Sequence, residues 1–377
     1  METPPLVPDG LTREAFVRDY WQRHPCLIRH WLDPVPQALA PDRLARLAER
    51  PELGSRLIQG SFEARDWTVE YGPFNPEGLE SLPPRNWTWL VQDVDKVVPE
   101  VARILAQFAF VPRLMLDDVM ISQAAPGGSV GPHTDQYDVF LVQTSGTRRW
   151  QLARDFQPDL ERDFELAVLA DFQPERTLDV TPGQILYLPP GVAHHGVALD
   201  ACQTWSVGIR APSAGELMIL LGEWLESDPT APPPRLGIPA DSDAGEATHE
   251  LDPALVTRTR ELLQEATGLG TGADRFVGEA LTGHRIFEPS EFPPPVDASR
   301  PMVLLDHVRR AWVTEGDTAR LFVNGSSTPC PSDLARTFCG TRPWTRAVLV
   351  EALGETGAED LLDWLEGIDA LGNPPAS

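Results

Sequence analysis

Residues 131–140 read "GPHTDQYDVF", and in them a glycine-rich turn becomes an apolar run. His133 and Asp135 lie two positions apart, the spacing at which residues of a β-strand point to the same face. Two such side chains could bind one metal ion. The H-x-D pair alone is a weak signal because short motifs arise by chance. His133 could instead cap a turn, and Asp135 could pair with a surface arginine.

The sequence around this stretch is rich in short apolar runs from about residue 110 to 212. The runs contain many β-branched and aromatic residues and are separated by glycine and proline, as in "YDVFLVQTSG" (137–146) and "CQTWSVGIR" (202–210). Closely spaced short strands with turn residues between them are typical of an all-β barrel or sandwich. The sequence therefore predicts that the H-x-D pair lies in a β domain.

Two further segments strengthen the prediction that His133 and Asp135 bind a metal ion. "YLPPGVAHHGVAL" (187–199) supplies another histidine just past a Pro-Pro-Gly turn. Two histidines and one carboxylate on one face form the triad that binds Fe(II) and leaves positions open. In "TRRWQLA" (147–153), Arg148 shares a strand face with Trp150, whereas Arg149 lies on the other face. An arginine inside a barrel needs an anion, and a carboxylate suits its planar fork; the alternative is an internal salt bridge.

Helical periodicity predicts the remaining elements. Before the β region, we expect helices within 11–24, 36–50 and 93–108, and a short strand at 26–29. After it, we expect helices at 216–227, 253–267, 302–313 and 358–371, a linker at 288–301 and a hairpin at Asn324-Gly325.

Composition limits the choice of partner and compartment. The formal net charge is −25, so the surface repels phosphate and favours a basic partner, although acidity also serves solubility alone. Residues 285–377 hold 8 arginines against 14 acidic residues, which argues against DNA binding there. The four scattered cysteines indicate reduced thiols. With neither a signal peptide nor a membrane helix recognisable, we expect a cytoplasmic protein.

These segments together resemble a known family, the JmjC-type ribosomal oxygenases. The resemblance rests on "ISQAAPGGSVGPH" (121–133), "GPHTDQYDVFLVQTSGTRRW" (131–150), "LYLPPGVAHHG" (186–196) and "WSVGIRAP" (205–212). The N-terminal "FVRDYWQRHPCLIRHW" (16–31) and the helical second half match as well. The similarity covers nearly the whole chain, and the block around His133 is its most specific part.

The resemblance implies an α+β chain with a JmjC double-stranded β-helix, a cupin-like jelly roll, at residues 1–211. A helical dimerisation region at 212–287 and a winged-helix-like domain at 288–377 would follow. It further implies a homodimeric dioxygenase that uses Fe(II), 2-oxoglutarate and O₂. The substrate implied is an arginine of large-subunit ribosomal protein number sixteen, hydroxylated at carbon 3.

Site residues follow from the motif matches. His133, Asp135 and the histidine after Pro-Pro-Gly, His194, would be the iron ligands, and Arg148 would hold the far carboxylate of 2-oxoglutarate. The chain departs from the family at two positions. His195 follows His194, and strand alternation lets only one of them face the iron; we predict His194. Ala124 stands where a close relative has a serine near the cosubstrate.

Strand parity suggests where the substrate binds. If residue 124 faces the interior, so does Asp118 on the same strand, and a buried carboxylate needs a cation. A substrate guanidinium would satisfy it, with Tyr137 or Ser206 assisting. Alternatively, Asp117 or Asp118 pairs with an internal arginine.

Three other functions remain open from the sequence. The chain could hydroxylate histidine or asparagine, it could demethylate lysine, or it could be a binding protein with a JmjC-like scaffold. A cupin enzyme acting on small molecules would normally carry an H-x-H pair and a glutamate, which residues 133–140 lack. The intact triad and Arg148 favour an enzyme over a non-catalytic binding protein.

Overall fold

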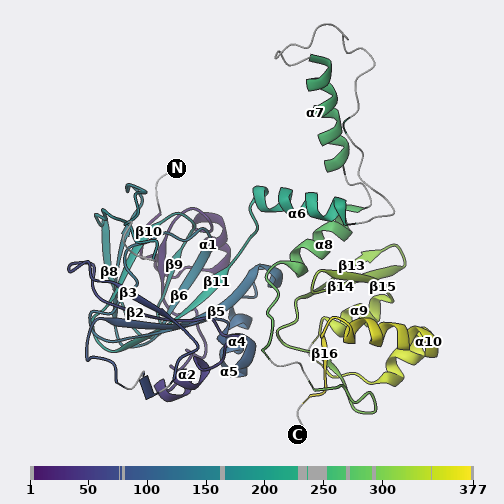
Figure 1. The fold of residues 1–377 in the computed structure, drawn as a ribbon, viewed down its shortest axis with the longest axis horizontal. Helices are drawn as coiled ribbons and strands as arrows, with labels where there is room; N and C mark the ends of the chain where they lie inside the picture. Colours follow the sequence, from purple (N-terminus) through teal and green to yellow (C-terminus); the bar gives the residue numbers. More distant parts are fainter. Residues whose placement is uncertain are drawn as a thin grey trace. The chain divides into compact units, whose positions relative to one another are not determined.

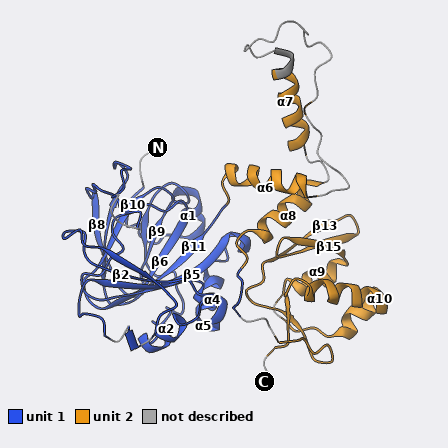
Figure 2. Cartoon of the chain, in the orientation of Figure 1, with its two compact units in different colours: residues 1–211, 287–292 blue, residues 212–286, 293–377 orange. Residues whose placement is uncertain are grey.

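The fold was obtained as a computed structural model, which describes residues 4–75, 77–78, 81–161, 166–227, 236, 253–268, 272–290, 294–340 and 342–374 (Figure 1). The chain divides into two compact units (Figure 2). Unit 1 comprises residues 1–211 and 287–292, and unit 2 comprises residues 212–286 and 293–377.

Unit 1 is built on a large antiparallel sheet. In spatial order its strands are β1 (Cys26–Ile28), β9 (Ile185–Leu188), β6 (Asp138–Ser145), β11 (Cys202–Ile209), β5 (Leu116–Ala124), β4 (Trp87–Val91), β2 (Ser55–Gln59) and β3 (Thr68–Tyr71). Seven strands from β5 to β11 account for the β region predicted between residues 110 and 212. The sequence pattern did not predict β2, β3 and β4, which extend the same sheet beyond β5.

A second, three-stranded sheet lies against the first. It consists of β10 (Ala193–Ala198), β7 (Arg148–Ala153) and β8 (Arg176–Val180), in that order. Inward-facing residues of both sheets share one apolar cluster: Val139, Leu141, Leu186 and Leu188 from the large sheet, and Trp150, Leu152 and Val180 from the small one. The two sheets therefore enclose a common interior, as a jelly roll requires.

The outer face of the large sheet is covered by the N-terminal helices. Its outward residues, among them Phe140, Val119 and Trp205, pack into the largest apolar cluster of the unit. The helices on this face are α1 (Arg13–Asp19), α2 (Pro41–Leu47), α4 (Val94–Val97) and α5 (Pro99–Ala102), with the 3-10 segments η1 (Arg103–Phe108) and η2 (Arg113–Met115). The single helix predicted at 93–108 is wrong. Pro99 cannot continue it, and a new short helix begins there.

Unit 2 begins with the helices α6 (Ala214–Glu226), α7 (Pro253–Thr267) and α8 (Ala273–Gly283). A three-stranded sheet follows, made of β13 (Arg310–Glu315), β14 (Thr318–Val323) and β15 (Ser326–Cys330). The predicted hairpin is confirmed. Asn324 and Gly325 join β14 to β15 with φ angles of 45° and 81°, the left-handed values that a tight two-residue turn needs.

One prediction in unit 2 is wrong. Residues 302–313 were expected to form a helix, but they form β12 (Val303–Leu304), a turn and the start of β13. β13 pairs along its length with β14, and Trp312 lies opposite Leu321. This hairpin, together with the pairing of β12 with residues 371–372, overrides the local helical periodicity. The unit ends with α9 (Ser332–Phe338), α10 (Arg346–Glu366) and β16 (Leu371–Gly372).

The structure also bears on the cysteines and on membrane-spanning helices. All four cysteines are free thiols, as predicted. Among the helices that the structure describes, none has the length and apolar character needed to cross a bilayer.

Candidate metal centre and cosubstrate pocket

Three potential ligands converge at one end of the barrel. His133, Asp135 and His194 each offer a ligand atom, and these atoms lie within 4.8 Å of one another. His194 Nε2 is 3.6 Å from Asp135 Oδ2, and the two imidazole centroids are 4.2 Å apart. The group has the composition of the two-histidine, one-carboxylate triad, whose remaining coordination positions stay open.

The backbone holds these ligands differently from the sequence prediction. His133 and Asp135 were expected on one strand, but β6 begins only at Asp138. His133 forms an isolated bridge with His194, and the N–H of each residue donates to the carbonyl of the other at 3.0 and 2.9 Å. The Asp135 carbonyl accepts from Gly191 N–H at 2.8 Å. The Pro-Pro-Gly turn and the H-x-D segment therefore fix each other.

Hydrogen bonds orient both imidazoles. His133 Nδ1 is 2.9 Å from the Gly131 carbonyl, and His194 Nδ1 is 2.9 Å from the Val192 carbonyl. A carbonyl only accepts, so each Nδ1 carries the proton. Each Nε2 consequently presents its lone pair, which is the form that ligates a metal.

Burial keeps His194 neutral. Desolvation, followed by the neighbouring His133, lowers the pKa of His194 to about 4, while Asp135 opposes the shift. A neutral imidazole needs no deprotonation before it binds a metal ion.

His195 faces the opposite side of β10. Its ring lies 5.5 Å from that of Phe62 and 6.1 Å from that of Phe172, outside the barrel interior. Burial lowers the pKa of His195 to about 4, and its buried Nε2 has no hydrogen-bond partner. Strand alternation thus brings His194, and not His195, to the triad.

Arg148 and Arg149 are separated by the same alternation. Arg149 is exposed and its Nε donates to Asp179 at 2.7 Å. Arg148 is 5% exposed, and its Nε and Nη2 have no hydrogen-bond partner. Its guanidinium carbon lies 5.7 Å from the Trp150 ring centroid. A buried guanidinium with two unpaired donors fits a carboxylate ligand.

Trp150 connects Arg148 to the triad. Its ring lies 5.8 Å from that of His194, and its buried Nε1 is also without a partner. Gly196 faces Trp150 across the β7–β10 ladder, and a Cβ at that position would approach the indole ring to 2.6 Å. Only glycine leaves room there for the tryptophan.

Asp118 lies near the start of β5, on the same side of the strand as Met120. It is partly buried, accepts the Asp93 N–H at 3.1 Å, and faces Gly208 of β11. Burial, followed by the charges of Asp93 and Asp117, raises its pKa to about 7. No arginine or lysine among the described residues forms an ion pair with Asp118. A cationic ligand would favour its charged form.

Asp117, next to Asp118, pairs with an arginine of the chain, which is the alternative that the sequence left open. Arg210 Nε donates to Asp117 Oδ2 at 2.6 Å, and the guanidinium of Arg210 stacks over Tyr137 with its carbon 4.2 Å from the ring centroid. Burial, opposed by Arg210 and reinforced by Asp135, raises the pKa of Tyr137, so the phenol stays protonated. Sequence reasoning missed Arg210, although a cation directly after strand 202–209 was a usable signal.

The other predicted positions follow the expected parity. Ser206 is 7% exposed and lies opposite Met120, on the same face as Asp118. Ala124 is fully buried and packs with Ala198 and Cys202 in a cluster of small side chains. No hydroxyl is available at residue 124 itself.

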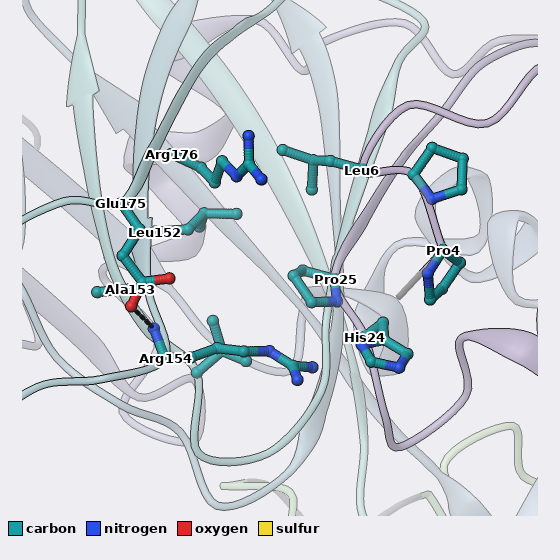
Figure 3. Close-up of a pocket in the computed structure, with 11 residues that line it drawn as sticks. Pro4, Leu6, His24, Pro25, Leu152, Ala153, Arg154, Glu175 and Arg176 are labelled. Carbon is teal, nitrogen blue, oxygen red and sulfur yellow. Dashed lines mark hydrogen bonds between the residues drawn. The ribbon is translucent and has the colours of Figure 1, made fainter. Parts of the chain in front are cut away.

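A cavity of about 460 Å³ lies at the edge of the barrel between the starts of β1 and β8 (Figure 3). Leu152 and Val192 line it and also belong to the interior cluster. Arg154, Arg176, His24 and Glu175 contribute charged or titratable side chains. This mixed-charge rim contrasts with the acidic surroundings of Asp118.

The fold and this site define a JmjC-type protein, and comparisons with known proteins agree. The family model for the JmjC domain matches residues 103–217. The chain is 38% identical over 218 residues to a protein of Haemophilus influenzae named "Probable ribosomal oxygenase", a match covering 56% of this chain and 53% of that one. It thus spans about half the length of that relative.

A longer match is to the "Ribosomal protein uL16 3-hydroxylase" of Escherichia coli, 32% identical over 314 residues, or 79% of this chain and 78% of that one. The solved structure of YcfD from E. coli has a TM-score of 0.81 at 27% identity and covers 96% of this chain and 98% of its own. YcfD in complex with cobalt and 2-oxoglutarate has a TM-score of 0.78, with the same identity and coverage. The chain belongs to the JmjC ribosomal oxygenases, and the predicted JmjC fold is confirmed.

Proposed function

We propose that this protein is an Fe(II)- and 2-oxoglutarate-dependent protein hydroxylase. The observation that carries the proposal is the combination of the triad with the unpaired guanidinium of Arg148 inside one barrel. Two imidazoles with free Nε2 lone pairs and one carboxylate suit Fe(II). When bound, iron and 2-oxoglutarate supply oxidative chemistry in which one atom of O₂ enters succinate and the other enters the product.

Each residue then has a defined task. His133, Asp135 and His194 would hold the metal, and Arg148 would bind the far carboxylate of 2-oxoglutarate through paired donors. Trp150 lies against the Arg148 guanidinium and limits its freedom. The interior formed by the two sheets would exclude bulk water and fix the geometry of the reacting groups.

We propose an arginine side chain as the target. The E. coli relative is named for 3-hydroxylation of ribosomal protein uL16, a large-subunit protein. A C–H bond carries no charge that the enzyme can hold, so the guanidinium has to be held instead. Asp118 supplies a carboxylate that has no cationic partner among the described residues, with Tyr137 and Ser206 also on the inner side. The net charge of −25 favours encounter with a basic ribosomal protein.

Mass spectrometry tests this function. The protein is incubated with separated ribosomal proteins, Fe(II), 2-oxoglutarate and O₂, and intact masses are compared with a sample lacking 2-oxoglutarate. We expect a gain of one oxygen atom on a single large-subunit protein, located on an arginine by fragmentation. Succinate production without such a gain would point to a small-molecule substrate, and a gain on histidine or asparagine would overturn the arginine assignment.

We also propose a homodimer and three domains, at residues 1–211, 212–287 and 288–377. On α6, Met218 and Ile219 are 56% and 64% exposed, which is unusual for neighbouring large apolar side chains. A second copy would cover them, and light scattering should give twice the chain mass of 41.6 kDa. The β13–β15 sheet with α9 and α10 supports a winged-helix-like domain, and a ribosomal substrate would place the protein in the cytoplasm.

A further inference from the structure

The inner face of the barrel carries another buried hydrogen-bonding group, the hydroxyl of Thr88 on β4. Thr88 is 0% exposed, and its Oγ1 has no hydrogen-bond partner. Leaving a buried hydroxyl unpaired costs about 1–3 kcal/mol, so such a group needs an explanation.

Strand register places Thr88 on the inner side. It lies directly opposite Ala124 of β5, and Leu90, two residues further along β4, lies opposite Ser122. Leu90 belongs to a cluster that the inward-facing Met120 contacts. Since residues two apart on a strand share a face, Thr88 faces the interior together with Ala124.

Thr88 and Arg148 border the same small group of side chains. Ala124, Ala198 and Cys202 pack together, and they come from both sheets. Ala198 lies opposite Arg148 across the β10–β7 ladder, as Ala124 lies opposite Thr88. Residues 127 and 128 tie the two sheets at this level, because Gly127 N–H donates to the Ala198 carbonyl at 2.8 Å and Ala198 N–H donates to the Gly128 carbonyl at 3.0 Å.

We propose that Thr88 is a cosubstrate-binding residue whose hydroxyl donates to the far carboxylate of 2-oxoglutarate beside Arg148. This inference rests on the function proposed above. Arg148 Nε and Nη2 together with Thr88 Oγ1 provide three unpaired donors for a carboxylate that has about four acceptor positions. The methyl-sized side chains of Ala124 and Ala198 cannot compete for these donors. The same arrangement selects for a 2-oxo acid that ends in a carboxylate.

The test is equilibrium binding to the full chain loaded with Mn(II) in place of iron, measured by titration calorimetry. For Thr88→Val, we expect the Kd of 2-oxoglutarate to rise about ten-fold, because a hydrogen bond to a charged group is lost. The Kd of 2-oxopentanoate, which has the same chain length without the far carboxylate, should stay within about two-fold of the parent. Thr88→Ser keeps the hydroxyl and should keep the parental affinity for 2-oxoglutarate.

Thr144→Val is the matched control. Thr144 is also buried, but its Oγ1 donates to the Gln203 carbonyl at 3.0 Å. Loss of that bond should lower the Tm and leave the Kd of 2-oxoglutarate unchanged. Thr88→Val removes an unpaired group, so the Tm of the ligand-free protein should not fall. If Thr88 had only a structural role, Thr88→Val would lower the Tm and leave the Kd of 2-oxoglutarate unchanged.

The outcomes separate this inference from the proposed function. If the parent binds 2-oxoglutarate and Thr88→Val binds it equally well, the role of Thr88 is overturned while the proposed function stands. If the parent does not bind 2-oxoglutarate at all, the proposed function itself fails. Should Thr88→Val not fold, Thr88→Ala compared with Thr88→Ser makes the same distinction.

Discussion

The two faces of the small sheet carry the same pair of residue types with opposite consequences. The inner face has His194 and Arg148, and the outer side has His195 and Arg149. Arg149 has an acidic partner at the surface, and His195 packs between phenylalanine rings. Arg148 is buried with unpaired donors, and His194 meets two other potential ligands. A residue's chemistry here depends on the side of the sheet more than on its type.

Exchanging the histidines for alanine one at a time tests this comparison most severely. His194→Ala should reduce Fe(II) affinity and peptide hydroxylation by more than about 100-fold, since even residues that only orient ligands contribute 10–100-fold. His195→Ala should retain the metal, because its ring lies outside the triad. Metal content by atomic absorption and turnover by mass spectrometry measure both effects. Loss of iron from His195→Ala with retention in His194→Ala would reverse the assignment.

Arg148 and Arg149 allow the two faces to be compared in their effect on 2-oxoglutarate binding. Arg148→Met should weaken 2-oxoglutarate binding about 100-fold, because two hydrogen bonds to a carboxylate are removed. Arg149→Met breaks an exposed ion pair with Asp179 that solvent screens, and it should leave the Kd unchanged. Titration calorimetry on the Mn(II)-loaded protein gives both values. Equal Kd values for the two variants would contradict the role of Arg148.

The same comparison of inner and outer faces can be made for two acids, Asp118 and Asp179. Asp118→Asn should raise the KM for a basic peptide about ten-fold at pH 8 and leave the Kd of 2-oxoglutarate unchanged. Asp179→Asn, on the outer side, should change neither quantity. Because the pKa of Asp118 is raised to about 7, peptide binding by the parent should strengthen as pH rises through 7, and the variant should lack this step. If Asp118→Asn had the same KM as the parent, Asp118 would not be the residue that binds the target guanidinium.

The same pKa makes a separate prediction about stability. An acid with a folded-state pKa of about 7 and an unfolded value of about 3.9 binds more protons when folded between those values. The free energy of unfolding therefore falls as pH rises through that window, and the destabilisation is complete above it. Asp118→Asn should be about 1–3 kcal/mol more stable than the parent at pH 8 and similar at pH 4. Urea unfolding at both pH values measures this difference.

The smallest effect concerns the outer histidine. His195→Phe replaces an imidazole with a buried unpaired Nε2 by an apolar ring next to Phe62 and Phe172. We expect a gain of about 1 kcal/mol in unfolding free energy with normal iron content. A loss of stability would show that the His195 ring makes an interaction that a phenyl ring cannot replace.

Local signals in the sequence locate most of the site. The β-rich texture, the H-x-D pair, the Pro-Pro-Gly histidine and the parity of Arg148 depend only on alternation along single segments. Of the predictions that failed, the helix at 93–108 overlooked the local signal of Pro99, and the others involve pairing between strands. His133 is held by a bridge to His194 instead of a strand of its own, and residues 302–313 form strands because β16 pairs with β12 and β14 pairs with β13.

The acid pair at 117–118 shows the same limit. Parity placed Asp118 inside, and Arg210 directly after strand 202–209 offered a cation, but only the fold shows that Arg210 pairs with Asp117 and stacks on Tyr137. Similarly, no local pattern singles out Thr88, because its position beside the cosubstrate pocket depends on the register of β4 with Ala124.

The amino-acid order by itself determined the class of domain, the acidic character and which side chains could serve as ligands, because these follow from composition and from a two-residue period. Only the tertiary structure decided that a bridge to His194 holds His133, that Arg210 pairs with Asp117, and where an unpaired hydroxyl lies. Those outcomes depend on how distant strands are brought into register, and the packing of two sheets around one interior sets that register.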